Sequence, residues 1–214
     1  MYKTNTKRQR CLNCFKELDV EATLFELFYS QDPLCHSCRS LLEINHKTFE
    51  CEGVVLTAFY VYNDQASQWM MQIKEAHDIS LAPVFIHPFI NKIRKRVKNK
   101  TMIMVPSSKR KTEERGYHAL NEMFKPLKLE CKDVFIKDDV KQSKGKKKQR
   151  QEISQHIHLK DPSLKYGPIV LVDDICTTGE SLKACIHALK EQVESIEIIV
   201  LCIHPLWLHN KFQD

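Results

Sequence analysis

Strand, turn and helix signals follow one another within the stretch Ile169-Val170-Leu171-Val172-Asp173-Asp174-Ile175-Cys176-Thr177-Thr178-Gly179-Glu180-Ser181. Its aliphatic, mostly β-branched start indicates a strand buried on both faces. Two adjacent carboxylates come next, and a hydroxyl-rich turn with one glycine follows them. Apolar residues then recur at helical spacing from Leu182 to Leu189, which predicts a helix directly after the turn.

This order of elements suits an anionic ligand. Backbone N–H groups and the positive end of the helix dipole surround a turn that opens a helix. We expect Asp173 and Asp174 where the strand leaves the sheet, at the edge where open α/β sheets bind ligands. Carboxylates suit sugar hydroxyls or hydrated Mg²⁺, and the Thr-Thr-Gly turn suits a phosphate. The alternative is a plain turn followed by an ordinary N-cap.

The same stretch resembles the phosphoribosyl-pyrophosphate (PRPP) motif of type I phosphoribosyltransferases, which is an aliphatic strand, two acidic residues and a loop ending Thr-Thr-Gly. The resemblance implies that Asp173 and Asp174 hold the ribose hydroxyls, with Mg²⁺ bound alongside PRPP. It implies that the 5′-phosphate is held by four residues of the loop and helix start, namely Thr177, Thr178, Gly179 and Ser181.

Composition sets the class of protein. The 214 residues are 43% hydrophobic and 28% charged, which fits one α/β domain with a small appendage. The net charge of +6 is concentrated in residues 92–100 and 141–150; such clusters favour polyanions, and a solvated face is the alternative. Neither a secretory signal nor a membrane span is visible, so we expect a cytoplasmic protein without membrane insertion.

Two Cys-x-x-Cys pairs, Cys11 with Cys14 and Cys35 with Cys38, lie twenty residues apart near the N-terminus. Each pair can place two thiolates on one knuckle, and two knuckles complete a tetrahedral site for structural Zn²⁺. In a reducing compartment this reading is favoured over a disulfide framework, and scattered thiols or a redox pair are the alternatives. We expect a zinc-binding module at residues 1–52 and the larger domain at residues 53–214.

A second strand-and-loop pattern precedes the first. Met102 to Pro106 is expected to be a buried strand, and a polar loop from Ser107 to Tyr117 follows it. Three cations of this loop are the expected contacts for a second phosphate group, namely Lys109, Arg110 and Arg115.

Further along, a lysine-rich loop is expected either to close over a bound polyanion or to track a nucleic-acid backbone. Its candidate residues are Lys141, Gln142, Lys146, Lys147, Lys148 and Arg150. Buried strands alternate with helices along the chain. The last predicted strand is Ile196 to Ile203, and a short tail follows it. The pattern predicts a mainly parallel sheet with helices on both faces.

Taken in order, the motifs resemble those of the ComF family. They are the double Cys-x-x-Cys, Val105-Pro106, Lys109, Glu114-Arg115-Gly116-Tyr117, Lys141-Gln142, Arg150 and Asp173-Asp174-x-x-Thr177-Thr178-Gly179. Two departures stand out: His118 and Ala119 replace the Asn-Gln usual in the family, and Ile153 lies near the place of another Asn.

The ComF resemblance implies a type I phosphoribosyltransferase-like fold and a role in natural competence, the uptake and handling of single-stranded DNA. A ComFA-like helicase is the implied partner, and PRPP or a related ribose phosphate with Mg²⁺ is the implied ligand. A second hypothesis is an active phosphoribosyltransferase of nucleotide metabolism with an unidentified acceptor. We assign no catalytic residue, because displacement at the anomeric carbon needs positioned cations more than a protein nucleophile.

Overall fold

The computed structural model describes residues 10–18, 32–137 and 157–209. Within them a six-stranded sheet has the order β1-β2-β8-β7-β3-β4. Its strands are β1 (Thr48–Cys51), β2 (Val54–Val61), β3 (Thr101–Met104), β4 (Cys131–Lys132), β7 (Tyr166–Cys176) and β8 (Val193–Ile203). β1 pairs antiparallel with β2, and the other neighbours are parallel. A separate antiparallel pair joins β5 (Phe135–Lys137) and β6 (Ile157–Leu159).

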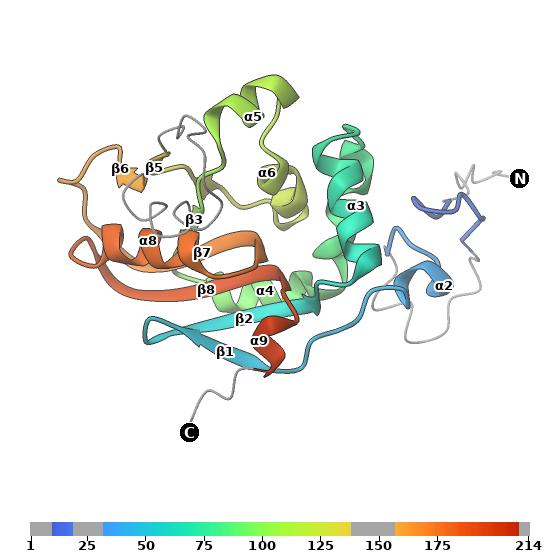
Figure 1. Ribbon diagram of the computed structural model, residues 1–214, viewed down its shortest axis with the longest axis horizontal. Helices are drawn as coiled ribbons and strands as arrows, with labels where there is room; N and C mark the ends of the chain where they lie inside the picture. Colours follow the sequence, from blue (N-terminus) through green and yellow to red (C-terminus); the bar gives the residue numbers. More distant parts are fainter. Residues whose placement is uncertain (1–9, 19–31, 138–156, 210–214) are drawn as a thin grey trace, which may run out of the picture.

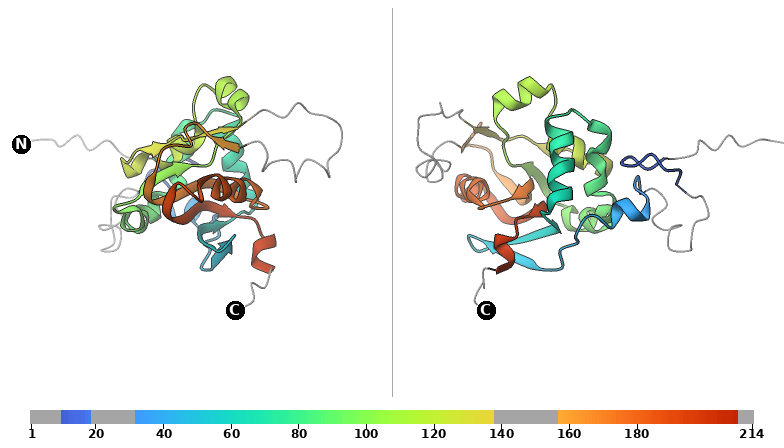
Figure 2. Two further views of the ribbon diagram at one scale, coloured as in Figure 1. Left: turned by 90° about the vertical axis from the view of Figure 1, so that its left-hand side faces the viewer. Right: turned by 45° about the vertical axis from the view of Figure 1, so that its right-hand side comes forward.

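Helices cover both faces of the sheet (Figures 1 and 2). One face carries α8 (Glu180–Leu189) and the β5–β6 pair. The other carries α3 (Asp64–Lys74), the 3₁₀ segment η1 (Ile79–Phe85), α4 (Ile90–Val97) and α6 (Ala119–Phe124). The remaining short elements are α2 (His36–Arg39), η2 (His87–Phe89), α5 (Lys109–Arg115), η3 (Lys125–Leu127) and α9 (Leu206–His209).

The aliphatic run in β7 explains this two-sided burial. Ile169 and Leu171 pack in the cluster that includes Cys185 of α8, whereas Val170 and Val172 pack in the cluster of the opposite face. All four aliphatic side chains are fully buried because successive strand residues point to opposite faces. The predicted mainly parallel sheet with helices on both faces is therefore confirmed.

The strand order places a switch point between β3 and β7. The chain leaves β3 for β4 on one side and leaves β7 through α8 for β8 on the other. Met104 pairs with Val172, and Cys176 pairs with Ile203, so the carboxyl ends of these strands meet at one edge. Crevices at such switch points are where open α/β sheets bind ligands.

The N-terminal segment lies against the larger domain. Cys11 and Cys38 belong to the same apolar cluster as Phe59 and Trp69, and β1 forms the edge strand beside β2. Residues 48–51 therefore belong to the main sheet, although the sequence placed them in the zinc-binding module. The domain boundary expected after residue 52 stays a prediction. Across the described ranges, none of the helices has the length and apolar character needed to traverse a bilayer.

Candidate functional site

The turn after β7 is built around Gly179 and Trp207. Gly179 has φ of +79° and forms the N-cap of α8, which has no side-chain cap. The indole Nε1 of Trp207, on α9, donates to the Thr177 carbonyl at 2.7 Å. A cavity of about 90 Å³ is lined by Asp173 and residues 175–182. The uncapped first turn of α8 leaves backbone N–H groups for an anion at this cavity.

Asp173 and Asp174 lie within β7, three and two residues before its last residue, whereas the sequence predicted them at the point where the strand leaves the sheet. Asp174 Oδ2 lies 2.6 Å from Nζ of Lys74, the last residue of α3. Asp173 Oδ1 accepts the backbone N–H of Asp174 at 2.8 Å. The strand continues because its ladder with β8 extends to Cys176, and the sequence does not show how far that pairing reaches. One member of the acidic pair is thus already matched to a cation.

Protonation differs from that of an exposed acidic pair. Burial, with a further contribution from the Asp174 carboxylate, raises the pKa of Asp173 to about 7, despite the opposing charges of Lys74 and Lys137. Burial alone would lower the pKa of Lys74, but the Asp174 carboxylate outweighs it and raises that pKa. Lys74 is therefore charged at neutral pH, and Asp173 changes its protonation near pH 7.

The Glu114–Tyr117 motif contacts the end of α3. Arg115 Nε donates to the Lys74 carbonyl at 2.6 Å, and the hydroxyl of Tyr117 donates to the Ile73 carbonyl. Arg115 also lies 3.7 Å from Glu75, and its side chain is only 7% exposed. These bonds satisfy carbonyls that a helix end leaves without partners. Arg115 holds α3, and so Lys74, in place, while its expected contact with a ligand stays a prediction.

The other two cations of this loop that were expected to bind a ligand are exposed. Lys109 and Arg110 lie on α5, so most of the expected polar loop is helical. Their side chains are 80% and 67% exposed and face Glu113 and Glu114 at 3.8 Å, one helical turn away. Exposed pairs of this kind contribute little to stability, so both cations remain available to a ligand.

His118 contributes a buried polar atom near the acidic pair. Its Nδ1 is buried and has no hydrogen-bond partner in the part of the chain that the structure describes. Burial lowers the pKa of His118, against the carboxylates of Asp133 and Asp174, so the ring is neutral at pH 7. An unsatisfied buried nitrogen is costly, and a ligand group that bonds it would remove that cost.

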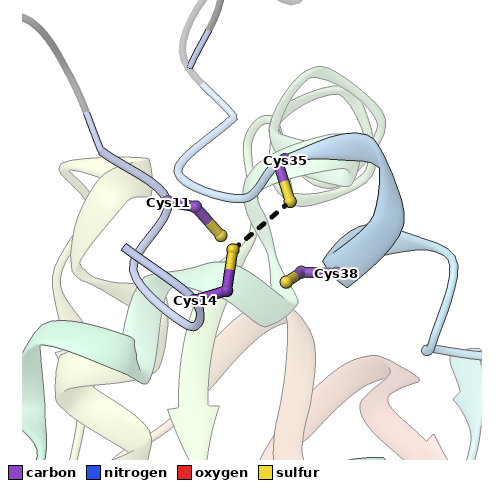
Figure 3. A group of neighbouring side chains, drawn as sticks. All are labelled: Cys11, Cys14, Cys35 and Cys38. Carbon is purple, nitrogen blue, oxygen red and sulfur yellow. Dashed lines mark hydrogen bonds between the residues drawn. The ribbon is translucent and has the colours of Figure 1, made fainter. Parts of the chain in front are cut away.

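The four N-terminal cysteines converge (Figure 3). The Sγ atoms of Cys11, Cys14, Cys35 and Cys38 all lie within 4.8 Å of one another, and Cys14 Sγ lies 3.7 Å from Cys35 Sγ. Four sulfurs at about 2.3 Å from a tetrahedral Zn²⁺ would be roughly 3.8 Å apart, so the donor set fits zinc. The predicted grouping of these cysteines is therefore confirmed, and the identity of the metal stays a prediction.

Hydrogen bonds link this cluster to α3. Asn13 Nδ2 donates to Cys38 Sγ at 3.2 Å, and Trp69 Nε1 donates to Asn13 Oδ1 at 3.0 Å. Against the effect of burial, backbone N–H groups of the cluster lower the pKa of Cys11 to about 6, whereas burial raises the pKa of Cys38 to about 12. Figure 1 shows α3 between the sheet and the N-terminal segment, so one helix reaches both candidate sites.

Some expected residues lie elsewhere, and others were missed. The lysine-rich loop residues Lys141, Gln142, Lys146, Lys147, Lys148 and Arg150 are outside the described residues. Lys74 and Trp207 were not predicted to contribute to the site. A lysine near the C-terminal end of a helix is common, because its charge complements the helix dipole, so Lys74 does not stand out in the sequence. Trp207 lies in the segment that was expected to be a short tail, so the sequence does not indicate its role either.

One family model and two known proteins match this chain. Residues 109–207 match the family model of the phosphoribosyl transferase domain. The chain is 25% identical to Competence protein ComFC of Bacillus subtilis, over 88% of this chain and 91% of that protein. It is 22% identical to Competence protein ComFC of Streptococcus pneumoniae, over 85% of this chain and 94% of that protein.

The matched domain contains α5, β7, the Thr177–Gly179 turn and α8. The fold and the site therefore define a phosphoribosyltransferase-type domain. The four-cysteine cluster ahead of that domain and the similarity to ComFC over most of the chain fit a ComFC-like protein.

Proposed function

We propose that this ComFC-like protein acts in natural transformation, in the handling of single-stranded DNA, and that its phosphoribosyltransferase-type domain binds PRPP or a related ribose phosphate with Mg²⁺. The single observation that most supports this ligand is one cavity at which α8 begins after Gly179 without a side-chain cap and which the carboxylate of Asp173 also lines. The competence role is supported by the ComFC relatives.

Each half of the site would take one part of the ligand. The backbone N–H groups at the start of α8 would bind the 5′-phosphate, together with the hydroxyls of Thr177, Thr178 and Ser181. Asp173 and Asp174 would bind the ribose hydroxyls, and Mg²⁺ would neutralise the pyrophosphate. Lys109 and Arg110 would approach the same charge from α5, and Lys74 would hold Asp174 in position through their ion pair.

The ligand is tested by calorimetric melting with PRPP and Mg²⁺. Binding to the folded state raises the melting temperature by mass action, and an Asp173→Asn/Asp174→Asn variant should lose the increase. Because the raised pKa of Asp173 protonates it below about pH 7, the increase should shrink as pH falls through 7. Ribose 5-phosphate and inorganic pyrophosphate serve as partial ligands. No increase at millimolar PRPP in the wild type would refute the proposed ligand.

Turnover is the second candidate function. The observation in its favour is the exposure of Lys109 and Arg110, which leaves cations free to stabilise a departing pyrophosphate. Incubation with PRPP, Mg²⁺ and a mixture of nucleobases should then release pyrophosphate, and Lys109→Gln/Arg110→Gln should slow that release. A wild-type protein that binds PRPP without releasing pyrophosphate would be a binding protein.

A further inference from the structure

A second cavity lies at the end of the sheet where β3 and β7 begin, opposite the end that holds the candidate ribose-phosphate site. It has a volume of about 590 Å³ and is lined by the end of α4 with its following turn, by the starts of β3 and β7, and by residues 129, 130 and 132. Pro168 at this cavity is six residues before Asp174 on β7, roughly 20 Å along an extended strand. The cavity is therefore separate from the candidate ribose-phosphate site.

Positive charge dominates the lining. Four cations, Arg94, Lys98, Lys100 and Lys132, face a single lining carboxylate, Glu130. Lys100 is already paired with Glu197. Among the described residues, Arg94, Lys98 and Lys132 form no ion pair: Arg94 donates to the Pro126 carbonyl at 3.3 Å, and the Lys132 ammonium lies 5.8 Å from the Tyr166 ring centroid. These three cations leave an excess of positive charge that attracts anions.

Apolar residues form part of the remaining lining, beside Asn99, Thr101 and Gly167. Val97, Met102 and Pro168 contribute to it, and Leu129 is 47% exposed. Inorganic phosphate would use the cations and leave this surface in water. A nucleotide unit would use both parts, with its base against the apolar residues and its phosphate on the cations. The volume is within the range of roughly 300–1,000 Å³ typical of sites for small ligands.

We propose that this cavity is a contact site for single-stranded nucleic acid, which places one base in the cavity and neighbouring phosphates on Arg94, Lys98 and Lys132. A duplex keeps its bases paired inside, so only a single strand can turn a base into the cavity. Lys95, exposed on α4 one turn before Lys98, extends the basic surface for the adjoining phosphates. The proposal rests on the DNA-handling part of the proposed function and assigns it a surface.

Filter binding of radiolabelled oligothymidylate, about 20 nucleotides long, tests the surface across a salt series. Affinity falls as salt rises, and each lost phosphate contact should reduce the magnitude of the slope of log affinity against log salt by about 0.7. Lys98→Gln/Lys132→Gln should therefore lower it by about 1.4. Leu129→Ser should weaken binding at every salt concentration and leave the slope unchanged. Lys47→Gln, an exposed lysine ahead of β1, should have no effect.

Each of four results would overturn the proposal. The first is an unchanged slope in Lys98→Gln/Lys132→Gln. The second is loss of binding in Lys109→Gln/Arg110→Gln instead, which would place the nucleic acid at the candidate ribose-phosphate site. The third is displacement of the oligonucleotide by PRPP with Mg²⁺. Thymidine monophosphate that binds as tightly as the oligomer would assign the cavity to a free nucleotide. PRPP melting of the same variants keeps the two sites distinguishable, because Lys98→Gln/Lys132→Gln should retain the PRPP effect.

Discussion

At the scale of single residues, the turn after β7 depends on what surrounds Gly179. A Cβ atom there would lie 3.0 Å from Cζ2 of Trp207 and 3.7 Å from Sγ of Cys51, in addition to the strain of φ near +79°. Gly53 has a similar φ of +74° and open space around it. Comparing substitutions at the two glycines therefore separates the energetic cost of backbone strain from the cost of steric contact.

We expect Gly179→Ala to lower the free energy of unfolding by about 2 kcal/mol more than Gly53→Ala, because only the former overpacks a buried tryptophan. It should also abolish the increase in melting temperature with PRPP. Urea denaturation measures the first effect and calorimetry the second. Equal destabilisation by the two substitutions would show that Trp207 yields to the new methyl group without cost.

The residue scale also shows how far sequence patterns reach. The Thr177–Ser181 turn and the four cysteines are local motifs, and both fold as expected. The pairing of Asp174 with Lys74 joins residues a hundred positions apart, and no periodicity reports it. Arg115 was expected to contact a ligand from a polar loop, and the sequence did not show its low exposure, which depends on where α3 ends.

At the scale of elements, α3 links the two candidate sites. Its buried face carries Trp69, which bonds Asn13 beside the cysteine cluster, and its last residue carries the cation that meets Asp174. The apolar face of this helix was predictable from its spacing of Trp69, Met70 and Ile73. Its contacts at both ends were not, because they come from residues far away in the chain.

Replacing Arg115 by methionine tests this arrangement. The end of α3 should lose its bond to the Lys74 carbonyl, and the free energy of unfolding should fall by about 2 kcal/mol in urea denaturation. The matched change Lys109→Met removes only an exposed pair and should cost about 0.5 kcal/mol or less. An Arg115→Met protein of wild-type stability that no longer responds to PRPP would instead assign Arg115 to the ligand.

At the scale of the whole molecule, the N-terminal cysteine segment and the larger domain share a core. Cys11, Cys38 and Leu42 pack with Phe59 and Trp69 in one apolar cluster. Arg39 of α2 adds hydrogen bonds to the Val84 carbonyl at 2.8 Å and to the Tyr60 hydroxyl at 3.2 Å. Sequence motifs distinguish two modules, but whether they unfold separately depends on contacts that motifs do not reveal.

We therefore expect removal of the metal to destabilise the entire protein. Protein purified without chelator should contain about one equivalent of zinc by metal analysis. Chelation, or Cys14→Ser, should shift a single calorimetric transition to lower temperature, whereas Cys131→Ser should leave the zinc content unchanged, because Cys131 lies outside the cluster. Two separate transitions, with the upper one unmoved by chelator, would mean that the modules fold independently.

The positions of the two tryptophans have a practical consequence. The chain contains only Trp69 and Trp207, and each indole N–H bonds a group at a different site, Asn13 beside the cysteines and the Thr177 carbonyl of the turn. The native protein thus contains one intrinsic fluorophore for each site. In a Trp69→Phe protein, emission would report the turn alone, and in a Trp207→Phe protein it would report the metal cluster alone. Metal loading and ligand binding can then be followed independently in one molecule without an added dye.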